Sequence, residues 1–285
     1  MPLSALGLLV VAAFLHAGWN TLIKESGDKL AFAWLALVVA GLAGLPLLAS
    51  GPIPPWIWPY AVVSGVAEVV YYLALIKAYE RSDLSWVYPL ARGAAPPLLT
   101  LWGILFLGED PTGFGLAGVA VIAAGIWTLG GGSLRHAGHE GILGKKGAGL
   151  WAMLAGLMIS VYSVVDKAAL TAAPFLVYLE LIFALTALFL SPVILLSSRR
   201  TAVVPLVARS WRSILLVGVA NLVTYLLVLA AFRLAPVSYA GSVREMSVVV
   251  AAFLGWKWLG ESGGMRRVAA ALLIFAGITL ITWKG

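Results

Sequence analysis

The sequence contains no cysteine among its 285 residues, and charged residues make up only 11% of it. The missing cysteines exclude disulfide scaffolds, thiolate metal sites and cysteine nucleophiles. Soluble domains carry roughly 25% charged residues. The scarcity of charge, together with 62% hydrophobic residues, therefore predicts an integral membrane protein. We interpret the net charge of +7 as lysine and arginine in cytoplasmic loops, and not as a surface for nucleic acid.

Motifs for catalysis and for cofactors are missing as well. The chain has no phosphate-binding glycine loop, no HExxH pair and no nucleophile elbow. His136 and His139 lie in a glycine-rich stretch and make a poor metal site, because a catalytic zinc needs three fixed protein ligands. We therefore expect no enzyme activity, no cofactor and no metal. Without a motif for ATP, the energy for any transport must come from gradients across the membrane.

Apolar segments of about 20 residues, the length that spans a bilayer as a helix, follow one another with short turns between them. The first has no basic start and no convincing cleavage site, so we expect it to remain as a span. The predicted spans cover residues 3–23, 30–49, 56–80, 85–107, 112–130, 148–167, 173–197, 211–233, 238–259 and 263–282. The expected fold is an all-α integral membrane protein with ten transmembrane helices.

Short matches recur in the same order in both halves of the chain. The letters LGE occur at 107–109 and at 259–261, and the corresponding positions of the two halves are 143 to 153 residues apart. The aligned pairs are Arg92 with Arg244, Glu68 with Asn221, Tyr72 with Tyr225, and Trp19 with Tyr162. Five spans per half is an odd number, which places the second half upside down. This predicts an inverted repeat, the plan of many secondary transporters.

The repeats give the expected domain organisation and orientation. We predict a first five-helix repeat at 1–130, a linker at 131–147 and a second five-helix repeat at 148–285. The turns after the odd-numbered spans hold 14 of the 19 lysines and arginines, and cytoplasmic loops are the ones that collect such residues. Both termini are therefore predicted to lie outside.

Glu68 is the most deeply placed acid, at the centre of the third predicted span. Tyr72 and Tyr79 share its helical face, and Asn221 and Tyr225 form the corresponding face of the eighth span. Ionisable groups at membrane depth are costly and usually face a cavity or a partner. Glu68 is thus a candidate proton carrier or partner of a substrate ammonium, or else a structural group paired with an arginine.

A second group of polar candidates lies on the first span, where His16, Trp19 and Asn20 share one face. His16 either bonds a neighbouring helix or contributes to substrate binding and proton coupling. Arg92 and Arg244 are expected near mid-depth, where each would bind a substrate carboxylate or form an ion pair with a glutamate.

Two expectations concern acids near these residues. Glu245 directly follows Arg244 and should point about 100° away around the helix, so no direct pair is expected between them. Asp166 and Lys167 end the sixth span and are expected at the membrane interface.

The pattern resembles the EamA family of the drug/metabolite transporter superfamily over essentially the whole chain. The resemblance is carried by HAGWNTLIK in the first span, by LGE before the fifth and tenth spans, and by two five-helix repeats with short loops. Within the family, the chain is similar to bacterial exporters of amino acids and aromatic metabolites. This similarity implies that a substrate would stack on His16, Trp19, Tyr72, Tyr79, Tyr225 and Tyr239.

The resemblance implies a carrier of the bacterial inner membrane that exports small organic metabolites by alternating access around a midplane cavity. Amino acids are the favoured substrates, aromatic ones first, with protons as a candidate coupling partner and a monomer or homodimer as the expected assembly. One alternative is efflux of hydrophobic organic cations, with Glu68 as the counter-charge. An alternative of another class is a membrane-embedded enzyme of lipid metabolism.

Overall fold

The computed structural model describes residues 1–81, 84–134, 147–250 and 264–284. Within these ranges the secondary structure is entirely helical. The helices are α1 (Leu3–Glu25), α2 (Lys29–Gly44), the 3-10 helix η1 (Leu45–Ser50), α3 (Ile57–Tyr79), α4 (Leu84–Leu107), α5 (Gly113–Leu134), α6 (Ala148–Ala169), α7 (Phe175–Leu195), α8 (Arg200–Leu234), α9 (Val237–Arg244) and α11 (Gly264–Lys284). Seven of the described helices are long and apolar enough to cross a bilayer, and two more apolar helices, Gly113–Thr128 and Val268–Trp283, are shorter. The chain is thus a multi-pass membrane protein.

The predicted spans agree with these helices except in three places. The second span ends as an α-helix at Gly44 and continues as η1, whose first turn contains Pro46. The eighth span is preceded by an extra helical segment, and Ser210 marks a kink between the two parts of α8 with non-helical angles (φ −131°, ψ 19°). The ninth span is helical from Val237 to Arg244, turns at 245–246 and is helical again over 247–250, and its remainder from residue 251 lies outside the described residues.

The helices of the two halves pair in a symmetric pattern. In order, α1 to α5 correspond to α6, α7, α8, α9 and α11. Helix α1 packs on α8 and α9, and correspondingly α6 packs on α3 and α4; likewise α2 packs on α8 as α7 packs on α3. In three further pairs, each helix packs on its own counterpart in the other half: α2 on α7, α4 on α9 and α5 on α11. Exchange of the halves leaves these named pairings unchanged, as a two-fold relation between the halves requires.

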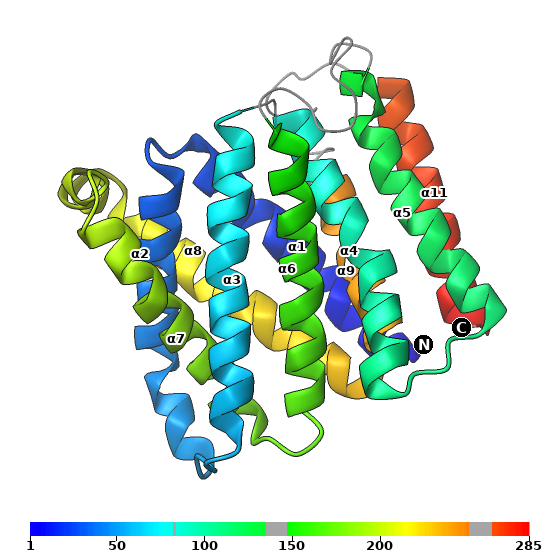
Figure 1. Cartoon of the computed structure of the whole chain (residues 1–285), viewed down its shortest axis with the longest axis horizontal. Helices are drawn as coiled ribbons and strands as arrows, with labels where there is room; N and C mark the ends of the chain where they lie inside the picture. Colours follow the sequence, from blue (N-terminus) through cyan, green and yellow to red (C-terminus); the bar gives the residue numbers. More distant parts are fainter. Residues whose placement is uncertain (82–83, 135–146, 251–263, 285) are drawn as a thin grey trace.

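Chain direction completes the relation between the halves. In the view of Figure 1, α3 runs upward from its start while α8 runs downward, and α5 and α11 also run in opposite directions. Each pair consists of corresponding helices, so the second half is inverted relative to the first. Both termini lie on the same side of the helix bundle, next to the ends of α5 and α11 (Figure 1).

Glycine allows a close contact between the halves. In the pair α5 and α11, a Cβ atom added at Gly118 would lie 2.7 Å from the carbonyl oxygen of Gly277, and one added at Gly277 would lie 2.7 Å from that of Gly118. Small residues let helix backbones approach in membranes, where van der Waals packing drives association. These two glycines therefore fix the distance between α5 and α11.

The first LGE motif also joins the halves. Gly108 has a φ of +64°, a left-handed conformation that glycine adopts without strain. This turn brings the Glu109 carboxylate to the start of α9, where it accepts hydrogen bonds from the backbone nitrogens of Val237 and Ser238. A carboxylate at a helix N-terminus satisfies free N–H groups and complements the helix dipole. The second LGE motif, at 259–261, lies outside the described residues.

Candidate functional site

A cavity of about 60 Å³ lies between the two halves, with residues from α1, α2, α3, α4, α6, α7, α8 and α9 in its walls. Pockets that bury a drug-sized ligand measure roughly 300–1,000 Å³. The polar and aromatic residues of the walls are His16, Trp19, Glu68, Tyr71, Tyr72, Arg92, Tyr162, Phe183, Asn221, Thr224, Tyr225 and Arg244. An organic molecule of amino-acid size can enter only if the helices move apart.

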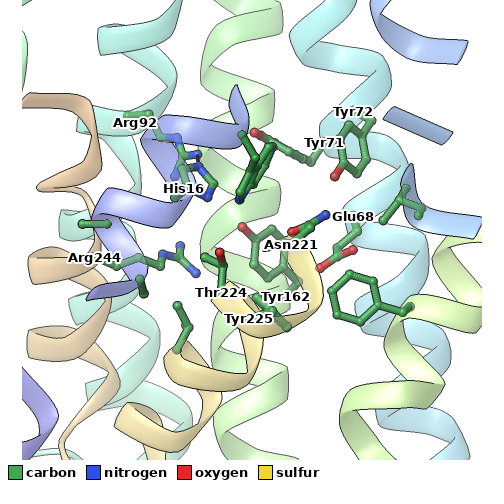
Figure 2. Close-up of a pocket in the computed structure, with 16 residues that line it drawn as sticks. His16, Glu68, Tyr71, Tyr72, Arg92, Tyr162, Asn221, Thr224, Tyr225 and Arg244 are labelled. Carbon is green, nitrogen blue, oxygen red and sulfur yellow. Dashed lines mark hydrogen bonds between the residues drawn. The ribbon is translucent and has the colours of Figure 1, made fainter. Parts of the chain in front are cut away.

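The two corresponding arginines meet at one end of the cavity (Figure 2). Arg92 is 3% exposed and donates from Nη1 to both carboxylate oxygens of Glu245, at 3.0 and 3.3 Å. Arg244 is 7% exposed and donates to Oε1 of the same carboxylate from Nε at 3.4 Å and from Nη2 at 3.3 Å. Glu245 itself is completely buried. A single carboxylate thus holds one guanidinium from each half.

The contact between Arg244 and Glu245 corrects the expectation that adjacent residues would point apart. That expectation considered only the angle between adjacent residues. Glu245, the C-cap residue of α9, keeps right-handed helical angles (φ −68°, ψ −6°), so the contact depends on the reach of the arginine side chain. The long arginine side chain turns back onto the carboxylate, and its Nη1 also donates to the Ser163 hydroxyl at 3.3 Å.

His16 completes this end of the cavity, which we call the basic end and which comprises His16, Arg92, Arg244 and Glu245. The Nη2 group of Arg92 lies within hydrogen-bonding distance of His16 Nε2. A guanidinium only donates, so Nε2 must accept and the ring is the neutral tautomer that carries its proton on Nδ1. In this arrangement a proton on Nε2 is incompatible with the contact to Arg92.

Glu68 lies at the other end of the cavity, beside Asn221 and close to Tyr72 in Figure 2. Its Oε2 accepts a hydrogen bond from the Thr186 hydroxyl of α7 at 3.0 Å. The two aligned pairs, Glu68 with Asn221 and Tyr72 with Tyr225, therefore all face one cavity. The side chains of Tyr162 and Tyr225 lie between Glu68 and the two arginines (Figure 2).

Asp166 lies in the last turn of α6, where the sequence predicted an interfacial residue. It is completely buried, and both of its carboxylate oxygens accept tyrosine hydroxyls, one from Tyr178 at 2.8 Å and the other from Tyr225. Tyr225 lines the cavity, so Asp166 lies directly behind the wall. Its neighbour Lys167 is half-buried and donates to the carbonyl oxygens of Phe232 and Ala235, at the end of α8. Helix α3 and helix α8 cover this part of α6, which sequence position alone does not reveal.

Aromatic rings form the walls between the two ends. Tyr162 is 6.3 Å from Tyr71 and 6.4 Å from Tyr225, measured between ring centroids, and both pairs are edge-on. Phe183 lies 6.1 Å from Tyr225 in the same edge-on manner. Such contacts hold the rings in place and leave faces available for stacking.

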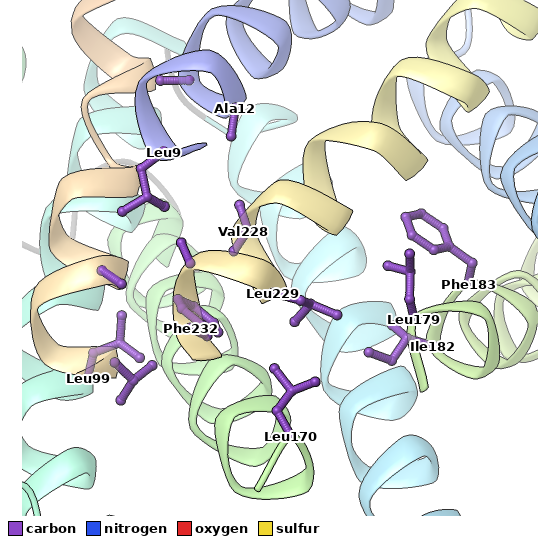
Figure 3. Packing of buried hydrophobic residues seen from close by; sticks show 14 of the residues in the cluster. Leu9, Ala12, Leu99, Leu170, Leu179, Ile182, Phe183, Val228, Leu229 and Phe232 are labelled. Carbon is purple, nitrogen blue, oxygen red and sulfur yellow. The ribbon is translucent and has the colours of Figure 1, made fainter. Parts of the chain in front are cut away.

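Apolar packing closes the cavity toward the side of the termini. Ala12 and Val228 line it, and one turn further along their helices Leu9 and Phe232 are completely buried in the main core. Figure 3 shows these side chains together with Leu229 of α8 and Leu99 of α4. A passage toward that side requires α1 and α8 to separate from their neighbours.

Three of the predicted site residues lie outside these walls. The Asn20 amide donates to the carbonyl of His16 in its own helix, at 2.9 Å. Tyr79 packs in a separate cluster with Leu75 and Trp151. Tyr239 is buried against the start of α5, where its hydroxyl accepts from the backbone nitrogen of Thr112 at 2.9 Å. The structure brings together the other eight: His16, Trp19, Glu68, Tyr72, Arg92, Asn221, Tyr225 and Arg244.

Several wall residues were not among the sequence candidates, although some carried a signal. Tyr162 was aligned with Trp19 in the repeat, and both line the cavity. Tyr71 and Phe183 gave no signal, because an aromatic residue in an apolar span is compatible with ordinary packing. Among the described residues, no group of three or more histidines and acids could hold a metal ion.

A membrane-embedded cavity, built jointly by two inverted halves and lined by charged and aromatic groups, is the architecture of a secondary transporter. The family model of the EamA-like transporter family matches residues 3–131 and again 146–283. The chain belongs to this family of drug/metabolite transporters. A search of curated proteins finds no match.

One solved structure, described only as the crystal structure of a protein, is similar over 99% of both chains. The TM-score is 0.70 and the sequence identity is 20%. This likeness shows a shared fold.

Proposed function

We propose that the protein is a carrier that exports small zwitterionic metabolites, with aromatic amino acids as the favoured substrates. The observation that carries the proposal is the separation of charge across the cavity, with two arginines at one end and Glu68 at the other (Figure 2). A zwitterion offers the complementary pair of charges on one small molecule. The basic end would receive its carboxylate and Glu68 its ammonium.

The walls between the ends suit an aromatic side chain. Tyr71, Tyr162 and Tyr225 present rings along the cavity, and Trp19 lies next to His16 with ring centroids 4.5 Å apart. Small-molecule sites commonly combine apolar and aromatic walls with a few placed polar groups. A substrate held at both charged ends would therefore lie with its side chain against these rings.

Alternating access is the mechanism that the two-half architecture favours. The cavity is too small for an amino acid as it stands, and the core around Leu9 and Phe232 blocks the side of the termini. Because Arg92 and Arg244 come from different halves, a carboxylate bound between them would hold the halves together. Rocking of the halves about this point would open one side at a time.

Protons are the proposed coupling ions, and His16 and Glu68 are the proposed carriers. The neutral His16 ring accepts from Arg92, so protonation of Nε2 would expel Arg92 from this contact and change the basic end. Removal of His16 as His16→Gln should therefore leave binding measurable while it weakens the dependence of uptake on an imposed pH gradient.

For localisation we propose the bacterial inner membrane with both termini outside, as a monomer or homodimer. Because the chain has no cysteine, a single introduced cysteine reports its side cleanly. Ser26 follows α1 and Ser50 ends η1, at opposite ends of α2. Ser26→Cys should be protected from an impermeant maleimide in whole cells and Ser50→Cys should be labelled; the reverse pattern would invert the proposed orientation.

Flux into reconstituted vesicles tests the substrate. Tryptophan should be transported and should saturate, tryptophanamide lacks the carboxylate, and N-acetyltryptophan lacks the ammonium. We expect both analogues to be transported at least about tenfold less well, since each leaves a buried charge without its partner. Equal transport of all three would refute recognition of a zwitterion.

The second candidate is efflux of hydrophobic organic cations. The acid Glu68 among tyrosine rings favours it, because rings and a carboxylate both attract cations. The arginines count against it, since they would repel such a substrate. Transport of a cationic dye and of tryptophanamide, without tryptophan, would favour this candidate. Chemical conversion of a lipid by the purified protein would instead support the membrane enzyme.

A further inference from the structure

The basic end contains two arginines but only one acid. This excess of positive charge arises from a difference between the halves. Arg92 and Arg244 correspond to each other, but the residue after Arg244 is Glu245 whereas the residue after Arg92 is Gly93. A side chain at Gly93 would collide with the Trp127 ring. In the first half, glycine therefore leaves space for the Trp127 ring at the position where the second half supplies an acid.

The acid and the arginines have different positions relative to the cavity. Arg92 and Arg244 line it, whereas Glu245 is completely buried and does not. Glu245 thus holds both guanidiniums from behind. Its hydrogen bonds to them measure 3.0 to 3.4 Å, longer than the roughly 2.7–2.9 Å of strong charge-assisted pairs. The guanidiniums keep donor capacity for another acceptor, and the buried Nε of Arg92 has no hydrogen-bond partner.

The charge of the basic end follows from these contacts. His16 accepts from Arg92 and is neutral in this arrangement, so it contributes nothing. Two guanidiniums and one carboxylate leave a net charge of one positive unit beside the cavity. Charges in a low-dielectric site interact strongly, so the site should favour an anion whose charge balances this excess.

We propose that Glu245 is a specificity-determining residue that sets the basic end to accept a single negative charge. This proposal rests on the proposed function, because it takes the basic end as the binding site for the substrate's carboxylate. Glu245 acts as a positioning residue, because it does not face the cavity and works through Arg92 and Arg244. A monoanionic group such as one carboxylate fits the site, and a dianionic group is rejected because it leaves one charge uncompensated.

The test uses small anions as probes of charge on the purified full-length protein, without any transport step. Acetate carries one negative charge and malonate carries two at pH 7.5. Binding of each is measured from the concentration dependence of the unfolding temperature at constant ionic strength, since salt screens charges. The wild-type protein should bind acetate at least as well as malonate.

Three variants change the net charge in steps. Glu245→Gln raises it to two units and should shift the malonate-to-acetate preference by about tenfold or more toward malonate. Arg244→Gln lowers it to zero and should weaken acetate binding by about tenfold or more. The double variant Arg244→Gln with Glu245→Gln returns it to one unit and should recover acetate binding to within about threefold of wild type. A role confined to packing predicts that the double variant is worse than Arg244→Gln.

Glu180→Gln is the matched control. Glu180 is a completely buried glutamate of α7 that lies against Gly44 of α2 and does not line the cavity. Its replacement removes a carboxylate of the same size and should leave the preference unchanged.

An unchanged preference in Glu245→Gln, or an equal change in Glu180→Gln, would overturn the proposal. If Glu245→Gln fails to fold, the comparison of Arg244→Gln with the double variant decides alone. Failure of the proposed function would appear separately, as absent tryptophan flux in a protein whose anion preference still follows its charge.

Discussion

In the first half of the chain, Glu68, Tyr72 and Arg92 face the cavity; the corresponding positions of the second half hold Asn221, Tyr225 and Arg244. The tyrosines and arginines are retained, but the acid becomes an amide. The only acid against the arginines in the described chain, Glu245, comes from the second half and has glycine as its counterpart. The halves thus share a framework and differ in charge.

The difference has a physical reason. Helix pairing between the halves depends on shape, and a two-fold relation requires that corresponding surfaces fit each other equally well. A small polar substrate has no such symmetry, since its charges differ at its two ends. A cavity with identical walls would offer the same charge from both sides. The two differences, Glu68 against Asn221 and Glu245 against Gly93, make the two ends of the cavity differ in charge.

The largest expected effect comes from breaking the symmetric contact itself. Gly277→Leu and Gly118→Leu should each prevent close packing of α5 and α11, because the added side chain meets a backbone carbonyl that no rotamer change relieves. We expect about 3 kcal/mol of destabilisation from either, measured as loss of monodisperse protein and a lower unfolding temperature. Gly7→Leu is the control, since nothing lies within 4 Å of a Cβ there. Tolerance of one substitution but not the other would show that the contact is less symmetric than we describe.

Exchange of the acid and the amide between the halves should have the next largest effect. Glu68→Asn should lower tryptophan flux by about 30-fold, because the substrate ammonium loses its counter-charge in a desolvated site. Adding Asn221→Asp to this variant returns an acid to the same end of the cavity (Figure 2) and should recover part of the flux. Flux is measured in proteoliposomes with matched protein content. If the double variant is no better than Glu68→Asn alone, the position of the acid matters beyond its charge.

The corresponding tyrosines should differ in their contribution to stability. Tyr225→Phe deprives the buried Asp166 of a hydroxyl donor, and hydrogen bonds to charged groups contribute about 1.5–3 kcal/mol. Tyr72 is also near Glu68, but its hydrogen-bond partner is the neutral amide of Asn221, so Tyr72→Phe should cost about 1 kcal/mol or less. Thermal unfolding in detergent compares the two. Equal losses would contradict the assignment of Asp166 as the distinguishing partner.

The smallest effect is expected at the surface. Arg199, at the start of α8, binds Asp28 at 2.8 Å and Glu80 at 3.2 Å, so it joins the second half to the first on the side opposite the termini. All three side chains are partly exposed, and exposed ion pairs contribute about 1 kcal/mol or less. Arg199→Ala should therefore lower the unfolding temperature only slightly, and less so in high salt. A large loss at high salt would point to a packing role for this side chain.

Much of the framework was readable from sequence because it depends on local composition. The spans, their short turns and the repeated LGE and arginine positions required only apolar length and spacing. The site was readable in part. The alignment of the halves placed Glu68, Asn221, Tyr72 and Tyr225 on corresponding faces of the third and eighth spans, and the structure puts all four on one cavity. The expectation for the Arg244–Glu245 pair was wrong because it considered only the angle between adjacent residues and not the reach of the long arginine side chain.

By itself the sequence determined that the chain enters the membrane, in two related halves with polar residues within the apolar spans, because hydrophobicity and periodicity act within each helix. Only the tertiary structure decided which of those polar residues meet. The sharing of Glu245 by two arginines, the burial of Asp166 behind Tyr225 and the exclusion of Tyr79 and Tyr239 from the cavity all follow from the packing of helices distant in sequence. Those contacts are set by the fit between surfaces, and no single segment encodes such a fit.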